Sequence, residues 1–276
     1  MKLSSRVSRL KPSATLAAAA KGKALKEKGI DVVSLTLGEP DFSTPKNIQE
    51  AAIASIKNGS ASFYTPVGGI KPLIDGIIER TKLDYGLTYE SNQVMVGTGA
   101  KFLLYTLFQA ILDKEDEVII PVPYWVSYGA QVELADGTPV YVEGSQDNGF
   151  KVKVADLEKA VSAKTKAFIL NSPCNPTGAI YTKEELEEIG NWAVKHDILI
   201  VADDIYGKLV YNGNVFTPIA TLSEEIKAQT LVINGVSKSY AMTGWRIGYA
   251  MGDTKIISQM NKIASQATSN PTAVSQ

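Results

Sequence analysis

From about residue 93 onward, short apolar runs alternate with longer stretches whose apolar residues recur at helical spacing. The runs predicted to be strands cover residues 94–96, 117–120, 139–142, 166–170, 198–202, 231–233 and 247–251. Two intervening helices are clear, an apolar one over 101–112 and one reaching His196 that Thr182 caps, with Glu185 completing a capping box. Strands that alternate with helices predict an α/β fold with a mostly parallel sheet.

The first part of the chain has a different pattern. Helices are predicted over residues 13–29, 45–56 and around 73–78, with a short strand over 32–37. Ser13 stands at the N-cap of the first helix, and Pro45 stands at the first helical position of the second, where its missing N–H costs nothing.

Composition excludes several classes of function. The formal net charge of -1 gives no electrostatic reason to expect nucleic acid or an anionic membrane as a partner. A single cysteine, Cys174, rules out an internal disulfide and fits a reducing compartment, and a single histidine, His196, argues against zinc sites and Ser-His-Asp triads. No apolar run approaches the length of a membrane span. Residues 2–20 loosely resemble a signal peptide, but their apolar run is mostly alanine and Lys21 and Lys23 end it early. From the missing targeting signals and the low cysteine content we expect a cytoplasmic protein.

The stretch over residues 234–248 carries the most suggestive chemistry. Lys238 lies among small residues between two apolar segments, and Arg246 follows eight positions later in a Gly-Trp-Arg-Ile-Gly run. Partial desolvation lowers the pKa of a lysine and leaves more of the neutral, nucleophilic amine. Such a lysine suits Schiff-base chemistry with a carbonyl compound.

The loops beyond the predicted strands supply groups to accompany this lysine. In open α/β sheets, ligands bind beyond the carboxyl ends of the strands. The loops there contain a glycine-rich helix entrance at 97–101, an amide-bearing turn at 171–178, a carboxylate and a phenol at 203–206, and the Lys238 segment. A helix entrance of this kind suits a phosphate. We therefore expect a phosphate cradle, an amide, a carboxylate, a phenol, a lysine and an arginine to meet at one edge of the sheet.

Together these motifs resemble those of class I pyridoxal-phosphate-dependent aminotransferases of the aspartate aminotransferase type. The matching runs are residues 37–42, 99–101, 123–128, 171–178, 203–206 and 237–248, and their order and spacing follow the family along the whole chain. The resemblance implies the fold type I architecture of pyridoxal-phosphate enzymes. Residues 45–276 would form the large cofactor-binding domain, and residues 1–44 an N-terminal segment whose helix and strand contribute to a small domain. Family members continue past Gln276 with the rest of that domain, including an arginine for the substrate α-carboxylate, so we expect the C-terminal part to be missing.

The resemblance also implies roles around the ring of pyridoxal 5'-phosphate. Lys238 would form the internal aldimine and shuttle the proton between the substrate and the cofactor. Asp203 would pair with the pyridine nitrogen and keep it protonated, which strengthens the ring as an electron sink. Asn175 and Tyr206 would bind the phenolic oxygen, and Trp125 would stack on the ring.

Further implied contacts concern the phosphate and the substrate. The turn formed by Gly99, Ala100 and Lys101 would hold the phosphate, with help from Ser237 and Arg246. Tyr64 would reach the phosphate of a neighbouring subunit, which requires a homodimer. Gly38 would lie against the substrate carboxylate, and Trp125 and Asn175 would also contact the substrate.

The implied reaction is transfer of an amino group from L-aspartate, or a similar amino acid, to a 2-oxo acid such as 2-oxoglutarate. Lys101, Ser13 and Thr15 are candidates to contact the distal carboxylate. An aromatic amino acid or prephenate could occupy the same site, and a β-lyase or a decarboxylase would need much the same ring contacts.

Two readings from other classes compete with transamination. A nicotinamide-dependent oxidoreductase is suggested by Gly97-x-Gly99, but Phe102 stands where the fingerprint requires its third glycine. A folded fragment without catalytic activity is the other alternative, because of where the chain ends. Cys174 and His196 are given no functional role.

Overall fold

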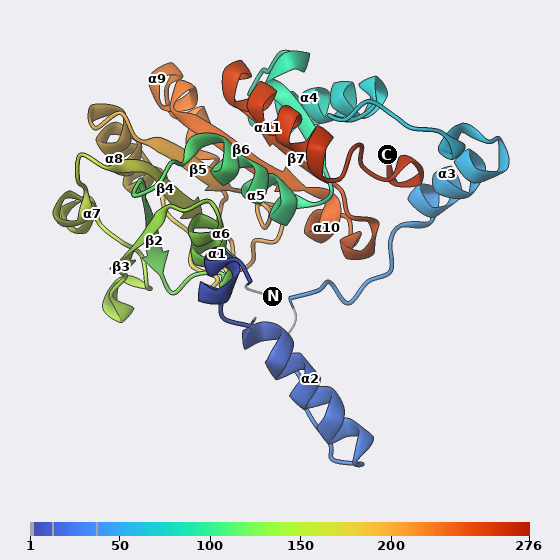
Figure 1. Cartoon of the computed structure of the whole chain (residues 1–276), viewed down its shortest axis with the longest axis horizontal. Coiled ribbons are helices and arrows are strands. Elements are labelled where there is room, and N and C mark those ends of the chain that lie inside the picture. The colour runs from blue at the N-terminus through green and yellow to red at the C-terminus, as the bar shows by residue number, and fades with distance from the viewer. Residues whose placement is uncertain (1–2, 13, 37) are drawn as a thin grey trace.

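The computed structural model describes residues 3–12, 14–36 and 38–276. Its centre is a seven-stranded sheet with the order β1-β7-β6-β5-β4-β2-β3 (Figure 1). The strands are β1 (Val94–Gly97), β2 (Glu117–Val122), β3 (Thr138–Glu143), β4 (Thr165–Asn171), β5 (Leu199–Asp203), β6 (Thr230–Gly235) and β7 (Gly248–Met251). β7 pairs antiparallel with both of its neighbours, and the remaining pairs are parallel. The predicted α/β fold with a mostly parallel sheet is confirmed.

Helices surround this sheet and carry the chain between strands. They are α1 (Ser5–Arg9), α2 (Ala14–Glu27), α3 (Lys46–Lys57), α4 (Lys71–Tyr85), α5 (Ala100–Ile111), α6 (Ser127–Leu134), α7 (Val154–Ala160), α8 (Lys183–Lys195), α9 (Glu224–Ala228), α10 (Val236–Ser239) and α11 (Thr254–Ala267). Short 3-10 turns occur at Ser60–Ser62, Ser91–Gln93, Gln146–Asn148, Ile219–Thr221, Thr243–Trp245 and Ala273–Ser275. None of the helices within the described ranges is long and apolar enough to cross a membrane.

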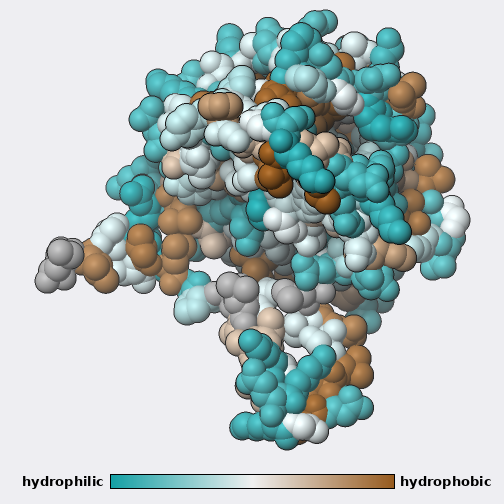
Figure 2. All heavy atoms as spheres, turned by 90° about the vertical axis from the view of Figure 1, so that its right-hand side faces the viewer, coloured by the Kyte–Doolittle hydropathy of each residue, from teal (hydrophilic) through white to brown (hydrophobic). Residues whose placement is uncertain are grey.

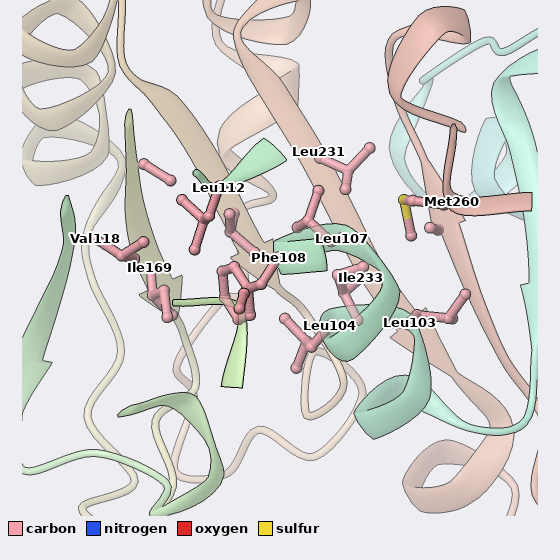
Figure 3. Packing of buried hydrophobic residues seen from close by; sticks show 14 of the residues in the cluster. Leu103, Leu104, Leu107, Phe108, Leu112, Val118, Ile169, Leu231, Ile233 and Met260 are labelled. Atoms are coloured by element: carbon pink, nitrogen blue, oxygen red, sulfur yellow. The ribbon is translucent and has the colours of Figure 1, made fainter. Parts of the chain in front are cut away.

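Successive side chains of a strand point to opposite sides of the sheet, and helices cover both sides, so strands β1, β4, β5, β6 and β7 are mostly buried on both faces. The edge strand β3 is largely exposed. Ile169 packs with α5, α6 and α11, whereas its neighbour Phe168 packs with α7 and α8. Figure 3 shows the first of these layers, in which Leu104 and Phe108 of α5 lie among side chains from the strands, including Ile233. A third cluster packs α4 against β1 and β7. This double coverage explains the near-continuous apolar strand segments.

Local sequence signals predicted the starts of α8 and α3 to within one residue. Thr182 is the N-cap of α8 and accepts a hydrogen bond from the Glu185 N–H at 3.3 Å, as the predicted capping box requires. α3 begins one residue later than predicted, so Pro45 is its N-cap. Helices α1, α6, α7, α9, α10 and α11 were not among the predicted elements.

The N-terminal segment differs from the prediction. α2 confirms the first helix, although Ser13, its predicted cap, lies outside the described residues, as does Leu37. The strand predicted over 32–37 is wrong for residues 32–36, which form no strand. Val33 and Leu35 are 86% and 92% exposed, and no neighbouring strand within the described chain pairs with them. α2 itself projects away from the sheet (Figures 1 and 2). The division of the chain after residue 44 stays a prediction.

Candidate active site

Chemistry-bearing residues gather at one edge of the sheet, as the topology requires. Asn171 and Asp203 are paired across β4 and β5 where these parallel strands end. Gly235 ends β6 opposite Gly248, which begins the antiparallel β7 at the same edge. Gly248 also pairs with Gly97 at the end of β1. The loops that leave this edge therefore start within a few strand spacings of one another.

Asp203 is the most deeply buried acid of this edge, at 3% exposure. Its Oδ2 accepts a hydrogen bond from the Tyr128 hydroxyl at 2.6 Å, and its Oδ1 lies 3.4 Å from the Ile205 amide nitrogen. Burial raises the pKa of the Asp203 carboxyl to about 6, while these two donors lower it. A cationic partner placed beside this carboxylate would favour its charged form.

An amide and a phenol lie next to this acid. The Asn171 side chain donates to the Asp203 carbonyl at 2.9 Å and accepts from the Asn175 N–H at 2.8 Å. The Asn175 amide in turn donates to the Tyr206 hydroxyl at 3.2 Å. Asn175 and Tyr206, which were predicted to share one ligand atom, are thus brought together. Burial raises the pKa of the Tyr206 phenol, so it is a neutral donor at ordinary pH.

Lys238 extends from α10, directly after β6. Its Nζ lies 5.8 Å from the centre of the Tyr206 ring and donates a hydrogen bond to the Gly38 carbonyl. Burial lowers the pKa of this half-buried amine, Glu39 opposes that change and Arg246 adds to it. The direction is the one expected from the apolar segments on either side of the lysine.

The turn that enters α5 has the features of an anion site. Gly99 has a φ of 88° just before the helix, and a Cβ there would collide with the Arg246 guanidinium. Arg246 donates to the Thr243 carbonyl at 2.8 Å and lies 3.4 Å from the Thr98 carbonyl. The Thr98 Oγ1 is buried without a hydrogen-bond partner among the described residues. Free helix amides, a guanidinium and an unpaired hydroxyl together fit a phosphate group.

Ala100 is the first residue of α5, and Ser237 is buried in α10, so both lie in the elements that border this turn. The Lys101 Nζ lies 4.8 Å from the centre of the Trp125 ring, and burial lowers the pKa of its amine. Trp125 packs edge-on against Tyr128, at 5.3 Å between ring centres. These contacts join the predicted lysine and tryptophan to the edge that carries Asp203.

Tyr64 is apart from the other predicted site residues. Its side chain is 94% exposed, and no hydrogen bond links it to them in the described part of the chain. Thr15 is half-buried and likewise has no hydrogen bond to these residues among the described contacts, and Ser13 lies outside the described residues. The structure of one chain therefore brings together all predicted site residues except these.

Tyr128 is a site residue that sequence reasoning missed. It stands three residues after Trp125, within the matched run 123–128, and that spacing was the one available signal. Cys174 lies near the site with its Sγ 3.7 Å from the Pro123 carbonyl, and His196 lies 3.1 Å from Glu158. Among the residues that the structure describes, no group of three or more His, Cys, Asp or Glu could hold a metal.

In both sequence and structure, this chain is similar to known aminotransferases. The family model described as aminotransferase class I and II matches residues 30–276. The chain is 58% identical to asparagine--oxo-acid transaminase of Streptococcus mutans and 55% identical to aspartate aminotransferase of Bacillus subtilis, in both cases over 100% of this chain and 70% of the relative. The solved aspartate aminotransferase of Thermus thermophilus with maleate superimposes with a TM-score of 0.95 at 43% identity, over 100% of this chain and 71% of that one.

Proposed function

Because this chain belongs to the class I and II aminotransferases, we propose that the edge around Lys238 is its active site and binds pyridoxal 5'-phosphate. The enzyme is a pyridoxal-phosphate-dependent aminotransferase of amino-acid metabolism. Its reaction moves the amino group of L-aspartate to a 2-oxo acid such as 2-oxoglutarate. The observation that carries the site assignment is the meeting of a half-buried lysine, a buried carboxylate and a guanidinium-flanked helix entrance at one sheet edge.

When bound, the cofactor supplies a carbonyl carbon for an amine and a ring that withdraws electrons from the substrate α-carbon. Lys238 provides that amine, and the lowered pKa of its side chain increases the fraction that is neutral. When neutral, the same Nζ can accept a proton from the substrate α-carbon and then donate it to the cofactor. Lys238 extends into the site from a short helix directly beyond β6.

The other residues bind and orient. Asp203 would hold a negative charge against the ring nitrogen, and the Tyr128 hydroxyl binds one of its oxygens. Asn175 and Tyr206, which are hydrogen-bonded to each other, would offer an amide and a phenol to the ring oxygen. The Gly99 turn and Arg246 would hold the phosphate, with Ser237 beside them, and Trp125 would cover the ring.

Covalent trapping tests the assignment of Lys238. The purified 276-residue chain is loaded with pyridoxal 5'-phosphate, treated with borohydride and digested, and the labelled peptide is identified by mass. We expect one label per chain, on Lys238, and none in Lys238→Ala. Lys255→Ala changes an exposed lysine of α11 and should label as the wild type does. A label on another lysine contradicts the assignment.

A second amino donor has a specific argument in its favour. The relative from Streptococcus mutans, named for asparagine, is 58% identical to this chain, slightly more than the aspartate enzyme from Bacillus subtilis. Steady-state assays of aspartate, asparagine and an aromatic amino acid as donors to 2-oxoglutarate, and of prephenate as an acceptor from aspartate, separate these substrates. They also separate transamination from β-elimination and decarboxylation, and they measure turnover by this chain itself.

We also propose that the enzyme is a cytoplasmic homodimer. Tyr64 and Phe63 are 94% and 77% exposed, and Ile53 and Ile56 of the preceding helix α3 are exposed as well. Figure 2, which faces the side that carries α3, shows hydrophobic residues on that surface. Exposed aromatic and aliphatic residues of this kind favour association. Sedimentation equilibrium at micromolar concentration tests the dimer, and a monomer at all concentrations contradicts it.

A further inference from the structure

Thr44 joins two parts of the chain that are far apart in sequence. Its hydroxyl donates to the Ala241 carbonyl at 2.7 Å, across 197 residues, and accepts from the Trp245 indole N–H at 2.9 Å. The Thr44 carbonyl accepts a hydrogen bond from the side chain of Gln49 in α3. The backbone of this half-buried threonine is therefore hydrogen-bonded to α3. Its hydroxyl uses both its donor and an acceptor position on a single loop, the one that contains Ala241 and Trp245.

That loop connects two residues assigned to the cofactor, Lys238 and Arg246. It contains two non-glycine residues with left-handed backbone, Ala241 at a φ of 51° and Arg246 at 60°. Such conformations are unfavourable for residues other than glycine and persist only where surrounding contacts hold them. The Thr44 hydroxyl binds the carbonyl of the first, and Trp245, directly before the second, binds the hydroxyl.

Residues shortly before Thr44 in the sequence also contact this loop. The Thr243 hydroxyl donates to a Glu39 carboxylate oxygen at 2.8 Å, and the Lys238 amine donates to the Gly38 carbonyl. These two contacts are exposed, whereas both Thr44 contacts are partly buried. Of the contacts between residues 38–44 and the loop, those of Thr44 are therefore the better shielded from water.

We propose that Thr44 is a positioning residue, which holds the loop from Lys238 to Arg246 in the conformation that receives the cofactor. This inference rests on the proposed function of that loop. Removing the hydroxyl leaves the Ala241 carbonyl and the Trp245 N–H without their partner, and the left-handed residues can relax. The amine and the guanidinium then lose their fixed separation, so the cofactor binds less tightly.

The test compares Thr44→Val, which keeps the shape but lacks the hydroxyl, with Thr44→Ser, which keeps the hydroxyl. The Kd for pyridoxal 5'-phosphate is measured by absorbance titration, along with the absorption maximum of the bound cofactor and the melting temperature. We expect Thr44→Val to raise the Kd about 10-fold and to shift the absorption maximum, because the Ala241 carbonyl and the Trp245 N–H both lose their hydrogen-bond partner. Thr44→Ser should stay within about twofold of wild type.

A stability-matched control separates positioning from general destabilisation. Thr182→Ala removes the N-cap of α8, away from the site, and should lower the melting temperature without changing the Kd. A Thr44→Val variant that melts earlier but keeps the wild-type Kd and absorption maximum overturns the inference.

Two further outcomes are also decisive. If Thr44→Val does not fold, Trp245→Phe removes the indole N–H and retains an aromatic ring, and it should raise the Kd in the same direction. An unchanged Kd in that variant counts against the proposal. If the wild-type chain itself binds no pyridoxal 5'-phosphate, the proposed function fails. If the wild type binds it and Thr44→Val binds it equally well, only the role of Thr44 fails.

Discussion

The Tyr128 hydroxyl lies 2.6 Å from Oδ2 of Asp203, and both side chains are buried. The bond links the first turn of α6 to the end of β5. Among the described residues, the second hydrogen bond to this carboxylate comes from the Ile205 N–H and is longer, at 3.4 Å. Tyr128 is therefore the main protein group that stabilises the charged form of Asp203 against the effect of burial.

Tyr128→Phe should raise the pKa of Asp203 in the cofactor-free protein and weaken binding of pyridoxal 5'-phosphate about 10-fold. The reason is that a hydrogen bond to a charged group contributes roughly 1.5–3 kcal/mol, part of which the bound cofactor recovers. An absorbance titration measures the Kd. Tyr211→Phe, at an exposed tyrosine, is the matched control and should bind as the wild type does. Equal affinities for Tyr128→Phe and wild type would show that the bond has no role in binding.

Asp203 also predicts how the stability of the cofactor-free protein varies with pH. Its folded pKa of about 6 is above the usual value of 3.8, so between these limits the folded chain retains a proton that the unfolded chain has lost. Stability from this group is greatest below about pH 4 and falls as pH rises to about 6, by roughly 3 kcal/mol in total. Asp203→Asn should remove this part of the decline.

Urea unfolding of both proteins between pH 4 and pH 7 measures the difference. Burial also raises the pKa of neighbouring Asp204, which changes stability in the same direction in both proteins. The relevant quantity is therefore the change in slope between wild type and variant. Identical slopes would refute the raised pKa of Asp203.

How far the sequence predicts this fold depends on whether the signal is local. The strands and the Thr182 cap were predicted because their apolar runs and capping residues are contiguous. The strand predicted over 32–37 was wrong for residues 32–36 because an apolar pattern cannot supply the neighbouring strand that pairing requires. Asn175 and Tyr206 were predicted together through the family resemblance, since nothing in their spacing reveals a hydrogen bond.

Tyr128 and Thr44 were missed for a related physical reason. Their partners lie 75 and 197 residues away in sequence, respectively. A buried tyrosine or a helix-preceding threonine has an ordinary structural explanation until the tertiary contact is known. Residues that act by positioning another group are thus the part of a site that only the folded chain shows.

Lys101→Gln should reduce kcat/KM for aspartate about 10- to 100-fold and reduce that for asparagine much less. The Lys101 amine lies beside Trp125 at the site edge, where it could pair with a distal carboxylate, and a charged hydrogen bond contributes roughly 1.5–3 kcal/mol. Steady-state kinetics with both donors measure the ratio. Lys114→Gln, at an exposed lysine beyond α5, should leave both values unchanged. An equal loss for both donors would remove Lys101 from recognition of the distal group.

Gly99→Ala should weaken pyridoxal 5'-phosphate binding by more than 10-fold. The Gly99 φ of 88° disfavours a side chain, and the new Cβ would displace the Arg246 guanidinium from the helix entrance. Gly149→Ala is the matched control, because Gly149 also has a positive φ, of 61°, but nothing lies within 4 Å of its added Cβ. Both variants should lose about 1 kcal/mol of unfolding free energy from the backbone, and only Gly99→Ala should lose affinity. Titrations that find the two variants equally affected would show that the guanidinium need not lie against the turn.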